Sequence, residues 1–394
     1  MWNPNTARSE DCLYLNVWRP SCSVGCNEPK PIMVWIYGGG FYSGSTTLDV
    51  YDGSYLSAYK DVIVVSIAYR LGVLGFMFSD SDDAPGNMGL LDQTMALRWV
   101  KDNAVNLGGS PDDITLFGES AGAISVGYHL LSPLSRDLFT YAIMESASPL
   151  FELPAGKKEA ALNKTIILAD ILSCPTDPPA AMMTCLREID SQTITKKQWE
   201  LERFYPGIPF WPLVDGYFLP DEPALMIQRG DVKNTSVIIG VNANEGTYFF
   251  VYLFMKYFPI NGDGQITERQ YDEILHEIFS GDSSKVSQVK QEYSREPGLS
   301  YTARLDAIYG DKRFKCPVVD FAREYAKVGG KIYLYSFEHR VSTNPWPEWL
   351  GVAHGYEIEI VFGLPLAPSS RYTDQERELS LKVMELWTNL AKTG

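Results

Sequence analysis

The sequence predicts an α/β protein with a mostly parallel central sheet and helices on both of its faces. Short apolar runs rich in β-branched residues alternate with longer helical stretches, and 394 residues can bury a large core. We expect strands at 12–18, 32–37, 62–69, 114–117, 141–145, 236–241 and 331–337, and helices at 89–107, 121–131, 157–172, 268–279 and 374–392. Residues 203–223, rich in proline and aromatic residues, are expected to form an irregular loop. No repeat or linker is visible, so residues 1–394 are expected to form one domain.

The composition excludes several classes of protein. Hydrophobic residues make up 45% of the chain and charged residues 21%, as in globular proteins. No run of 18 apolar residues predicts a membrane-spanning helix. The net charge of −15 disfavours binding to nucleic acid or to anionic membrane surfaces and favours attraction of cations.

The strongest local motif is Gly118-Glu119-Ser120-Ala121-Gly122, which follows the strand predicted at 114–117 and precedes a predicted helix. A Gly-x-Ser-x-Gly sequence between a strand and a helix is typical of the nucleophile elbow of the α/β-hydrolase fold. The glycines permit a very tight turn, which holds the serine in a strained conformation with its hydroxyl exposed. We expect Ser120 to be a nucleophile.

A second glycine-rich segment follows the strand predicted at 32–37, upstream of Ser120, where this fold places part of its oxyanion hole. Backbone N–H groups of Gly39, Gly40 and Ala121 are expected to stabilise the oxyanion. Losing one such donor typically costs about 3 kcal/mol of transition-state stabilisation.

A serine nucleophile needs a base, and the four histidines are His129, His276, His339 and His354. His129 follows the elbow on its helix and His276 lies in an amphipathic helix, where packing or solvent exposure is expected. His339 comes directly after the last strand and ends it. His354 lies in a longer loop, which has the reach that a base requires, and is therefore preferred.

The acid of the triad should lie between Ser120 and His354 in the sequence, just past a strand. Glu245 follows the strand predicted at 236–241 and is preferred. The alternative, Asp215 in Leu213-Val214-Asp215-Gly216, has the character of a turn aspartate.

The cysteines and sequons indicate an oxidising, extracellular setting. Cys174 and Cys185 enclose a short proline-containing segment typical of a disulfide-closed loop, and Cys22 and Cys26 flank another short loop. Asn163-Lys-Thr and Asn234-Thr-Ser are sequons for glycosylation. No spacing of cysteine and histidine suggests zinc, and the expected chemistry needs no metal or organic cofactor.

Three stretches resemble the type-B carboxylesterases and cholinesterases. Residues 9–17 (SEDCLYLNV) and 117–122 (FGESAG) are similar to two signatures of that family, and residues 346–357 (WPEWLGVAHGYE) resemble cholinesterases in particular. The resemblance covers nearly the whole chain. It implies the triad Ser120, Glu245 and His354, and an oxyanion hole of Gly39, Gly40 and Ala121.

The resemblance also implies a choline ester as substrate. Trp2 matches the principal choline-binding tryptophan of cholinesterases, Tyr248 matches a second aromatic wall, and Glu119 adds a negative charge near the cation. Cation–π attraction is worth about 2 kcal/mol when desolvated. Other positions that match lining or supporting residues of the gorge are Tyr42, Tyr51, Phe249, Tyr252, Trp346 and Tyr356, and Trp199 is a candidate for the gorge mouth.

The acyl pocket departs from that of vertebrate acetylcholinesterases. Leu153 stands where they keep a tryptophan, and Pro206 and Ile208 stand where they keep two phenylalanines. The smaller side chains predict tolerance of propionyl and butyryl choline. The alternatives are a general carboxylesterase acting on neutral esters, which Trp2 and Tyr248 disfavour, and a non-catalytic adhesion protein similar to neuroligins, which the intact triad disfavours.

The resemblance finally implies that the chain is an internal piece, truncated at both ends, of a single catalytic domain. Cys174–Cys185 matches a family disulfide, whereas Cys12 and Cys316 match half-cystines whose partners lie beyond the two ends. We therefore expect residues 1–394 to fold poorly alone. Oligomerisation and membrane anchoring are expected to depend on the absent C-terminal part, in a protein that is secreted or held at a cell surface such as a synapse.

Overall fold

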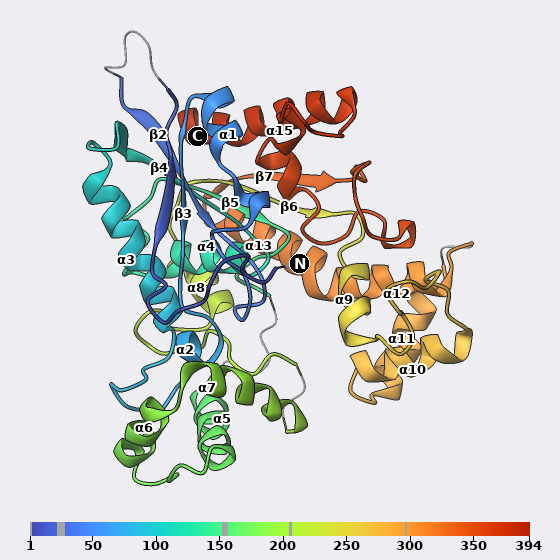
Figure 1. The fold of residues 1–394 in the computed structure, drawn as a ribbon. Helices are drawn as coiled ribbons and strands as arrows, with labels where there is room; N and C mark the ends of the chain where they lie inside the picture. Colours follow the sequence, from blue (N-terminus) through green and yellow to red (C-terminus); the bar gives the residue numbers. More distant parts are fainter. Residues whose placement is uncertain (1, 22–27, 152–156, 205–206, 296–297) are drawn as a thin grey trace.

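The computed structural model describes residues 2–21, 28–151, 157–204, 207–295 and 298–394, and its centre is a seven-stranded sheet (Figure 1). The strands are β1 (Leu15–Trp18), β2 (Lys30–Ile36), β3 (Ile63–Ile67), β4 (Gly109–Glu119), β5 (Tyr141–Glu145), β6 (Ser236–Asn242) and β7 (Lys331–Phe337). They lie side by side in the order β1-β3-β2-β4-β5-β6-β7. β1 runs antiparallel to β3. Among the described residues, all the other neighbouring strands of the sheet are parallel to each other.

The parallel register brings the carboxyl ends of the strands to one edge of the sheet. Glu119 of β4 pairs with Glu145 of β5, and Asn242 of β6 pairs with Phe337 of β7. The segments that leave this edge contain the glycine run, the elbow and the two loops predicted to supply acid and base. In open α/β sheets a ligand site typically forms outside the carboxyl ends of the strands.

Helices cover both faces of the sheet, which is why β2 and β3 are almost continuously apolar and buried. One face carries α1 (Ser54–Lys60), α14 (Ile358–Val361) and α15 (Asp374–Thr393), and the other carries α3 (Met88–Asn103), α4 (Ala121–Leu131), α8 (Pro223–Arg229) and α13 (Cys316–Lys327) (Figure 1). Trp35, Phe117 and Phe362 pack together in the core between the sheet and the first of these layers.

Two groups of helices lie outside these layers (Figure 1). One consists of α5 (Lys158–Ile171), α6 (Pro179–Glu188) and α7 (Ser191–Lys197), next to the short helix α2 (Gly72–Phe76). The other consists of α9 (Thr247–Leu253), α10 (Glu268–Ile278), α11 (Ser283–Tyr293) and α12 (Tyr301–Gly310), followed by a π-helical turn at Asp311–Lys315. The second group has a hydrophobic cluster of its own, which includes Phe250, Phe258, Leu275 and Leu305.

The predicted mostly parallel sheet with helices on both faces is confirmed, and each predicted strand and helix overlaps an observed one. Several boundaries differ by a few residues; for example, β1 begins at Leu15 rather than at residue 12, β4 begins at Gly109, five residues early, and α3 ends at Asn103 rather than at residue 107. The described part of the loop expected at 203–223 has neither helix nor strand except at its two ends, where Arg203 ends a 3₁₀ helix and Pro223 begins α8. Several short helices were not predicted, because one or two amphipathic turns leave little periodic signal.

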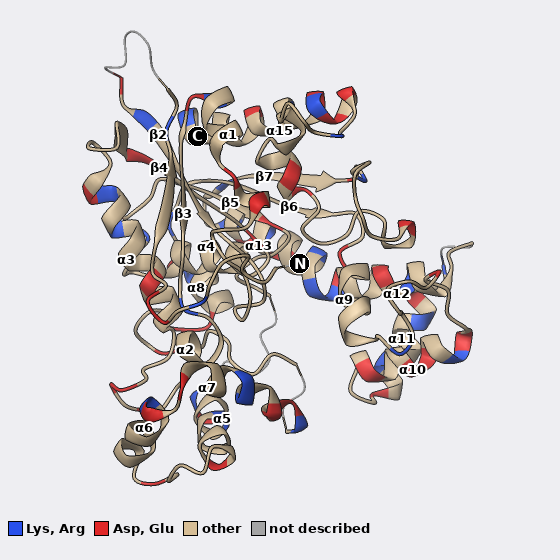
Figure 2. Cartoon of the chain, viewed as in Figure 1, with Lys and Arg blue, Asp and Glu red and all other residues tan. Residues whose placement is uncertain are grey.

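Charged residues lie mostly on the outer helices and loops, and the middle of the sheet is almost free of them (Figure 2). In the described part of the chain, no helix combines the length and the apolar character needed to cross a membrane.

Candidate active site

Ser120 lies at the tip of a tight turn between β4 and α4. Its backbone has φ 57° and ψ −122°, the strained conformation expected of an elbow nucleophile. The turn requires glycine at position 122, because a Cβ there would lie 1.9 Å from the carbonyl oxygen of Ile36. The backbone N–H of Ser120 donates to the carbonyl of Glu145 at 2.8 Å, which fixes the turn on the edge of the sheet. Ser120 is only partly buried, so a substrate can reach it.

The glycine run after β2 lies against this turn. A Cβ on Gly38 would lie 2.9 Å from the Cβ of Ser120, and Gly39 and Gly40 have φ values of 107° and 62°, which favour glycine. Within the described residues, the backbone N–H groups of Gly39, Gly40 and Ala121 donate to no protein acceptor. They are therefore free to stabilise a developing oxyanion.

His354 and Glu245 meet although they are far apart in the sequence. The Nδ1 atom of His354 lies 2.6 Å from Oε2 of Glu245, and both side chains are buried. The other carboxylate oxygen of Glu245 accepts a hydrogen bond from the backbone N–H of Asn242 at 2.7 Å. A carboxylate bound to Nδ1 fixes the imidazole tautomer in which Nε2 accepts a proton.

The alternative residues are engaged elsewhere. His129 is buried against Ser135 and Gln93, and burial lowers its pKa to about 3. His339 follows β7 and binds Glu376 at 3.1 Å. Asp215 accepts hydrogen bonds from the backbone N–H groups of Tyr217 and Leu219, which is the turn role expected of it.

Glu119 lies beside the imidazole. Its Oε1 atom is 3.0 Å from Nε2 of His354, so two carboxylates flank the ring, one on each nitrogen. Burial alone lowers the pKa of His354, but the charges of Glu119 and Glu245 outweigh this effect and raise the pKa above its usual value. Burial raises the pKa of Glu119, although the nearby His354 opposes the shift. In this arrangement Nε2 faces Glu119, and neither Nε2 of His354 nor Oε1 of Glu119 has a hydrogen-bond partner among the described residues.

Two further buried glutamates lie behind the site, and sequence reasoning did not assign them a role. Glu357 accepts a hydrogen bond from the side-chain amide of Asn242, and burial and the charge of Glu245 raise its pKa to about 7. Glu145 accepts a hydrogen bond from the indole N–H of Trp387 at 2.8 Å. Burial, followed by the charge of Glu357, raises the pKa of Glu145. A buried acid carries no periodic signal in a sequence, so only the fold identifies these two.

Trp2 and Tyr248 meet next to the imidazole. The indole N–H of Trp2 donates to the hydroxyl of Tyr248 at 2.7 Å, and the ring centroid of Tyr248 lies 6.1 Å from that of His354. A Cβ on Gly355 would lie 3.3 Å from Cζ2 of Trp2 and 3.6 Å from Oε1 of Glu119. The three residues predicted to bind choline therefore converge on one side of the histidine.

Most of the other predicted aromatic residues extend this group. Tyr51 stacks on Trp2, and Tyr248 contacts the rings of Phe249, Tyr252 and Trp346. Tyr356 packs in the same small cluster as Tyr248 and Trp346. Sequence reasoning missed Phe314, whose ring centroid lies 4.7 Å from that of His354. Phe314 lies in the π-helical turn, a distortion that is frequent at functional sites but leaves no sequence signal.

The acyl side of the site is described only in part, because Leu153 and Pro206 lie outside the described residues. Ile208 lies next to the glycine run, since a Cβ on Gly40 would lie 2.9 Å from Cδ1 of Ile208. Tyr42 and Trp199, both predicted near the entrance, are in edge-to-face contact with ring centroids 5.0 Å apart.

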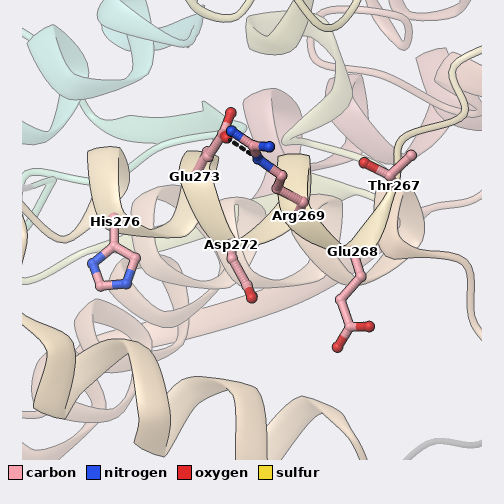
Figure 3. A pocket seen from close by; sticks show the side chains of 6 residues that line it. All are labelled: Thr267, Glu268, Arg269, Asp272, Glu273 and His276. Atoms are coloured by element: carbon pink, nitrogen blue, oxygen red, sulfur yellow. Dashed lines mark hydrogen bonds and ion pairs between the residues drawn. The ribbon is translucent and has the colours of Figure 1, made fainter.

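The hollows of the described surface include the following two. The smaller one, about 40 Å³, lies beside Trp2 and is lined in part by Trp346, Gly355 and Tyr356. The other lies along α10, in the outer helix group, and Figure 3 shows its six lining side chains. They come from one helix and its N-cap, with an ion pair of Arg269 and Glu273 at 2.9 Å and the surface residue His276 among them. This second hollow shares no residue with the triad.

The cysteines and sequons are placed as follows. Cys174 and Cys185 form the predicted disulfide, and Cys12 and Cys316 are free cysteines. Cys22 and Cys26 lie outside the described residues. Asn163 and Asn234 both lie in the described part of the chain, and their glycosylation stays a prediction. Among the described residues, no group of three or more histidine, cysteine or acidic side chains is arranged to hold a metal ion.

The sequence was compared with known proteins. It is 43% identical over 404 residues to the acetylcholinesterase of Bungarus fasciatus and 45% identical over 411 residues to the cholinesterase of Mus musculus. It is 40% identical over 440 residues to the acetylcholinesterase of Danio rerio. Each comparison covers 100% of this chain, but only 66%, 66% and 68% of the respective relative. The family model described as "Carboxylesterase family" matches residues 2–394, and the chain therefore belongs to the carboxylesterase family.

Proposed function

We propose that this chain is the catalytic domain of a serine esterase that hydrolyses choline esters through an acyl-enzyme. The observation that carries the proposal is the meeting of His354 with Glu245 at 2.6 Å, next to the Trp2–Tyr248 pair. Relatives named acetylcholinesterase and cholinesterase, which match over the whole chain, support the same substrate class.

Ser120 attacks the ester carbonyl while His354 takes the hydroxyl proton at Nε2. For this step the imidazole rotates so that Nε2 leaves Glu119 and faces the Ser120 hydroxyl, while Nδ1 remains hydrogen-bonded to Glu245. The N–H groups of Gly39, Gly40 and Ala121 bind the oxyanion, and the free donors at these positions support this role. The imidazolium then protonates the departing alcohol, and water, activated by the same histidine, releases the acid.

The quaternary ammonium group binds against the faces of Trp2 and Tyr248. Cation–π attraction is strongest on tryptophan and reaches about 2 kcal/mol in a desolvated site. Glu119 adds a negative charge beside Trp2, as the surroundings of Gly355 indicate. A neutral alcohol would gain neither contribution, so the arrangement favours choline esters over neutral esters.

The acyl pocket is proposed to accept groups larger than acetyl. Ile208 next to Gly40 is smaller than the phenylalanine implied by the family resemblance, and Leu153 and Pro206 are likewise smaller than the aromatic residues at their positions. We expect turnover of butyrylthiocholine to be comparable to that of acetylthiocholine. A steep preference for acetylthiocholine would contradict the roomy pocket.

An extracellular location fits the disulfide of Cys174 and Cys185, because such bonds persist in oxidising compartments. The sequons at Asn163 and Asn234 agree with this setting. Placement at a synapse, assembly into oligomers and membrane anchoring remain predictions from the family resemblance.

The test is hydrolysis of thiocholine esters by the purified protein, beside a Ser120→Ala control. We expect the control to lose activity by about a millionfold, the scale seen when a triad serine is removed. A neutral ester of the same shape, in which carbon replaces the ammonium nitrogen, separates a cholinesterase from a general carboxylesterase. Equal values of kcat/KM for the charged and the neutral ester would refute choline recognition.

A further inference from the structure

Asp306 is a buried carboxylate that the proposed mechanism does not use. It lies on α12, is 5% exposed, and reaches the segment between β6 and α9 that contains Glu245. Its Oδ1 atom accepts hydrogen bonds from the backbone N–H groups of Gly246 at 2.8 Å and Thr247 at 3.1 Å. These groups begin α9 and have no partner within the helix, so a carboxylate stabilises them. Asp306 therefore fixes the two residues that follow Glu245.

The second oxygen of Asp306 is linked to the histidine loop through Asn244. Oδ2 accepts a hydrogen bond from the side-chain amide of Asn244 at 2.8 Å. The side-chain carbonyl of Asn244 accepts one from the backbone N–H of Val352 at 2.9 Å, and its own backbone N–H donates to the Val352 carbonyl at 2.9 Å. Val352 lies two residues before His354. The chain of contacts thus runs from α12, past the acid, to the base.

At this junction the amide of Asn244 packs closely against the backbone of Gly351. Gly351 has φ 61°, and a Cβ there would lie 2.2 Å from Oδ1 of Asn244. Thr247 supports the same junction, because its hydroxyl donates to the carbonyl of Leu350 at 2.7 Å. The orientation of the Asn244 amide is dictated by its partners, since the NH₂ must face the carboxylate and the carbonyl must face the N–H of Val352.

Asp306 is held as an anion by these donors. Burial raises its pKa to about 6, and the hydrogen bond from Asn244 and the charge of Lys315 limit the rise. Lys315 donates to the carbonyl of Ala243 at 2.9 Å, on the same segment. At neutral pH the carboxylate therefore remains an acceptor for all three N–H groups that point at it.

We propose that Asp306 and Asn244 are positioning residues that hold the Glu245 and His354 loops in the register required for catalysis. The inference rests on the triad proposed above. Neither side chain touches Ser120 or an expected substrate position, and both act through the backbone next to a member of the triad. The Asp306 carboxylate and the Asn244 amide, which are 62 residues apart in the sequence, together connect the loop of Glu245 with the loop of His354.

The donor and acceptor pattern supplies a sharp test, which is to exchange the two side chains. In Asp306→Asn alone, the amide introduced at position 306 has two possible orientations, and both are unfavourable. In one its NH₂ faces the NH₂ of Asn244, and in the other it faces the backbone N–H groups of Gly246 and Thr247. The double variant Asn244→Asp with Asp306→Asn restores every bond, because the carboxylate introduced at position 244 accepts from the N–H of Val352 and from the amide introduced at position 306. Asp311→Asn is the matched control, since Asp311 lies five residues further along the chain and accepts a hydrogen bond from the Tyr293 hydroxyl at 2.7 Å.

The variants are compared by kcat and KM with acetylthiocholine and by the low-field proton resonance of the His354–Glu245 hydrogen bond. We expect Asp306→Asn to lower kcat on the order of tenfold to a hundredfold with little change in KM, because misplaced catalytic groups lose rate rather than binding. The resonance should weaken or shift in this variant. The exchanged pair should recover most of kcat and the resonance, and Asp311→Asn should match the wild type. Asn244→Asp alone should be milder, because one proton shared between the two carboxylates preserves their contact.

Equal activity of Asp306→Asn and wild type would overturn the inference, and so would a double variant no better than Asp306→Asn. If Asp306→Asn does not fold, Thr247→Val keeps the side-chain shape and removes the hydrogen bonds of the hydroxyl to the carbonyls of Leu350 and Asn244. An unchanged kcat in that folded variant would also count against the inference. The resonance separates the two proposals. An inactive wild type whose resonance still responds to the exchange would refute the esterase function and keep the positioning role.

Discussion

Replacing Glu119 by glutamine tests the electrostatic description of the site most directly. The substitution preserves the shape of the side chain and removes the negative charge that lies 3.0 Å from Nε2 of His354. Since this charge raises the pKa of His354, its removal must lower that pKa. The base is active only when neutral, so the acidic limb of the profile of kcat/KM against pH moves to lower pH.

The separation of the two groups sets the size of the shift. Two unit charges 3.0 Å apart interact by about 1.4 kcal/mol in water and by about 5.5 kcal/mol at an effective dielectric constant of about 20. One pKa unit corresponds to about 1.4 kcal/mol. The acidic limb should therefore move by about 1 pH unit at least and about 4 at most, and burial of both groups places the result above the lower bound.

The assay is hydrolysis of a neutral ester across the pH range, because a neutral substrate does not sense the lost charge through binding. Glu145→Gln is the matched control. It makes the same chemical change in a buried glutamate of the same cluster and keeps an acceptor for the indole N–H of Trp387. Glu145 is not among the main groups that shift the pKa of His354, so the acidic limb of the Glu145→Gln profile should move far less than that of Glu119→Gln. The reasoning would be refuted if the acidic limb of kcat/KM lay at the same pH in Glu119→Gln and in the wild type, or at higher pH in Glu119→Gln.

The remaining predictions concern binding, the triad and stability. Trp2→Ala should lower kcat/KM for acetylthiocholine about thirtyfold, the equivalent of about 2 kcal/mol of cation–π attraction, and should leave a neutral ester nearly unaffected. Glu245→Gln should lower kcat on the order of ten thousandfold, because the amide supports the wrong imidazole tautomer. Trp387→Phe leaves the buried Glu145 without its donor and should cost about 1–3 kcal/mol in chemical unfolding. Burial opposes the shift in Glu376, but hydrogen bonds from Ser342 and neighbouring groups lower its pKa to about 2. This contribution to stability is present above the ordinary carboxyl pKa of about 4.3 and is lost as pH falls toward 2. Glu376→Gln should therefore lower Tm at pH 7 and converge on the wild type near pH 2.

The middle of the sheet was predictable because its central strands are buried on both faces and read as continuous apolar runs, such as Ile63–Ile67. The sequence left the strand order undetermined, since that order depends on contacts between segments far apart in the chain. The helix group formed by α9–α12 was largely missed for a related reason. Its residues bury a separate cluster around Phe250 and Phe258, and α9, with 7 residues, has too few turns for a clear period.

The parts of the proposed site that have a local motif could be proposed from the sequence, and the parts that depend on tertiary contact could not. The glycines at 118 and 122 indicate that Ser120 is a nucleophile, and the chain order typical of the fold indicates Glu245 and His354. Nothing in the sequence around Phe314 or Asp306 indicates contact with the active site. Their positions follow from a π-helical turn and from a buried hydrogen bond between distant elements. A polar residue in a helix usually faces solvent, so a buried aspartate becomes visible only in three dimensions.

The buried acids around His354 have a further consequence for the kind of substrate that the site favours. Glu119 and Glu357 both raise the pKa of the imidazole, and burying several carboxylates together opposes folding. Under the proposed function, the charge of Glu119, beside Trp2, attracts a cationic substrate, whereas the charge of Glu357, behind the histidine, stabilises the imidazolium that forms in the transition state. An experiment can distinguish the two effects, because stabilisation of the imidazolium accelerates hydrolysis of a neutral ester as well, whereas attraction of the cation does not. Glu357→Gln, behind the histidine, should lower kcat for charged and neutral esters by the same factor, whereas Trp2→Ala should discriminate between them. If Glu357→Gln instead weakened only the charged ester, the buried cluster would act through substrate binding and not through the imidazolium.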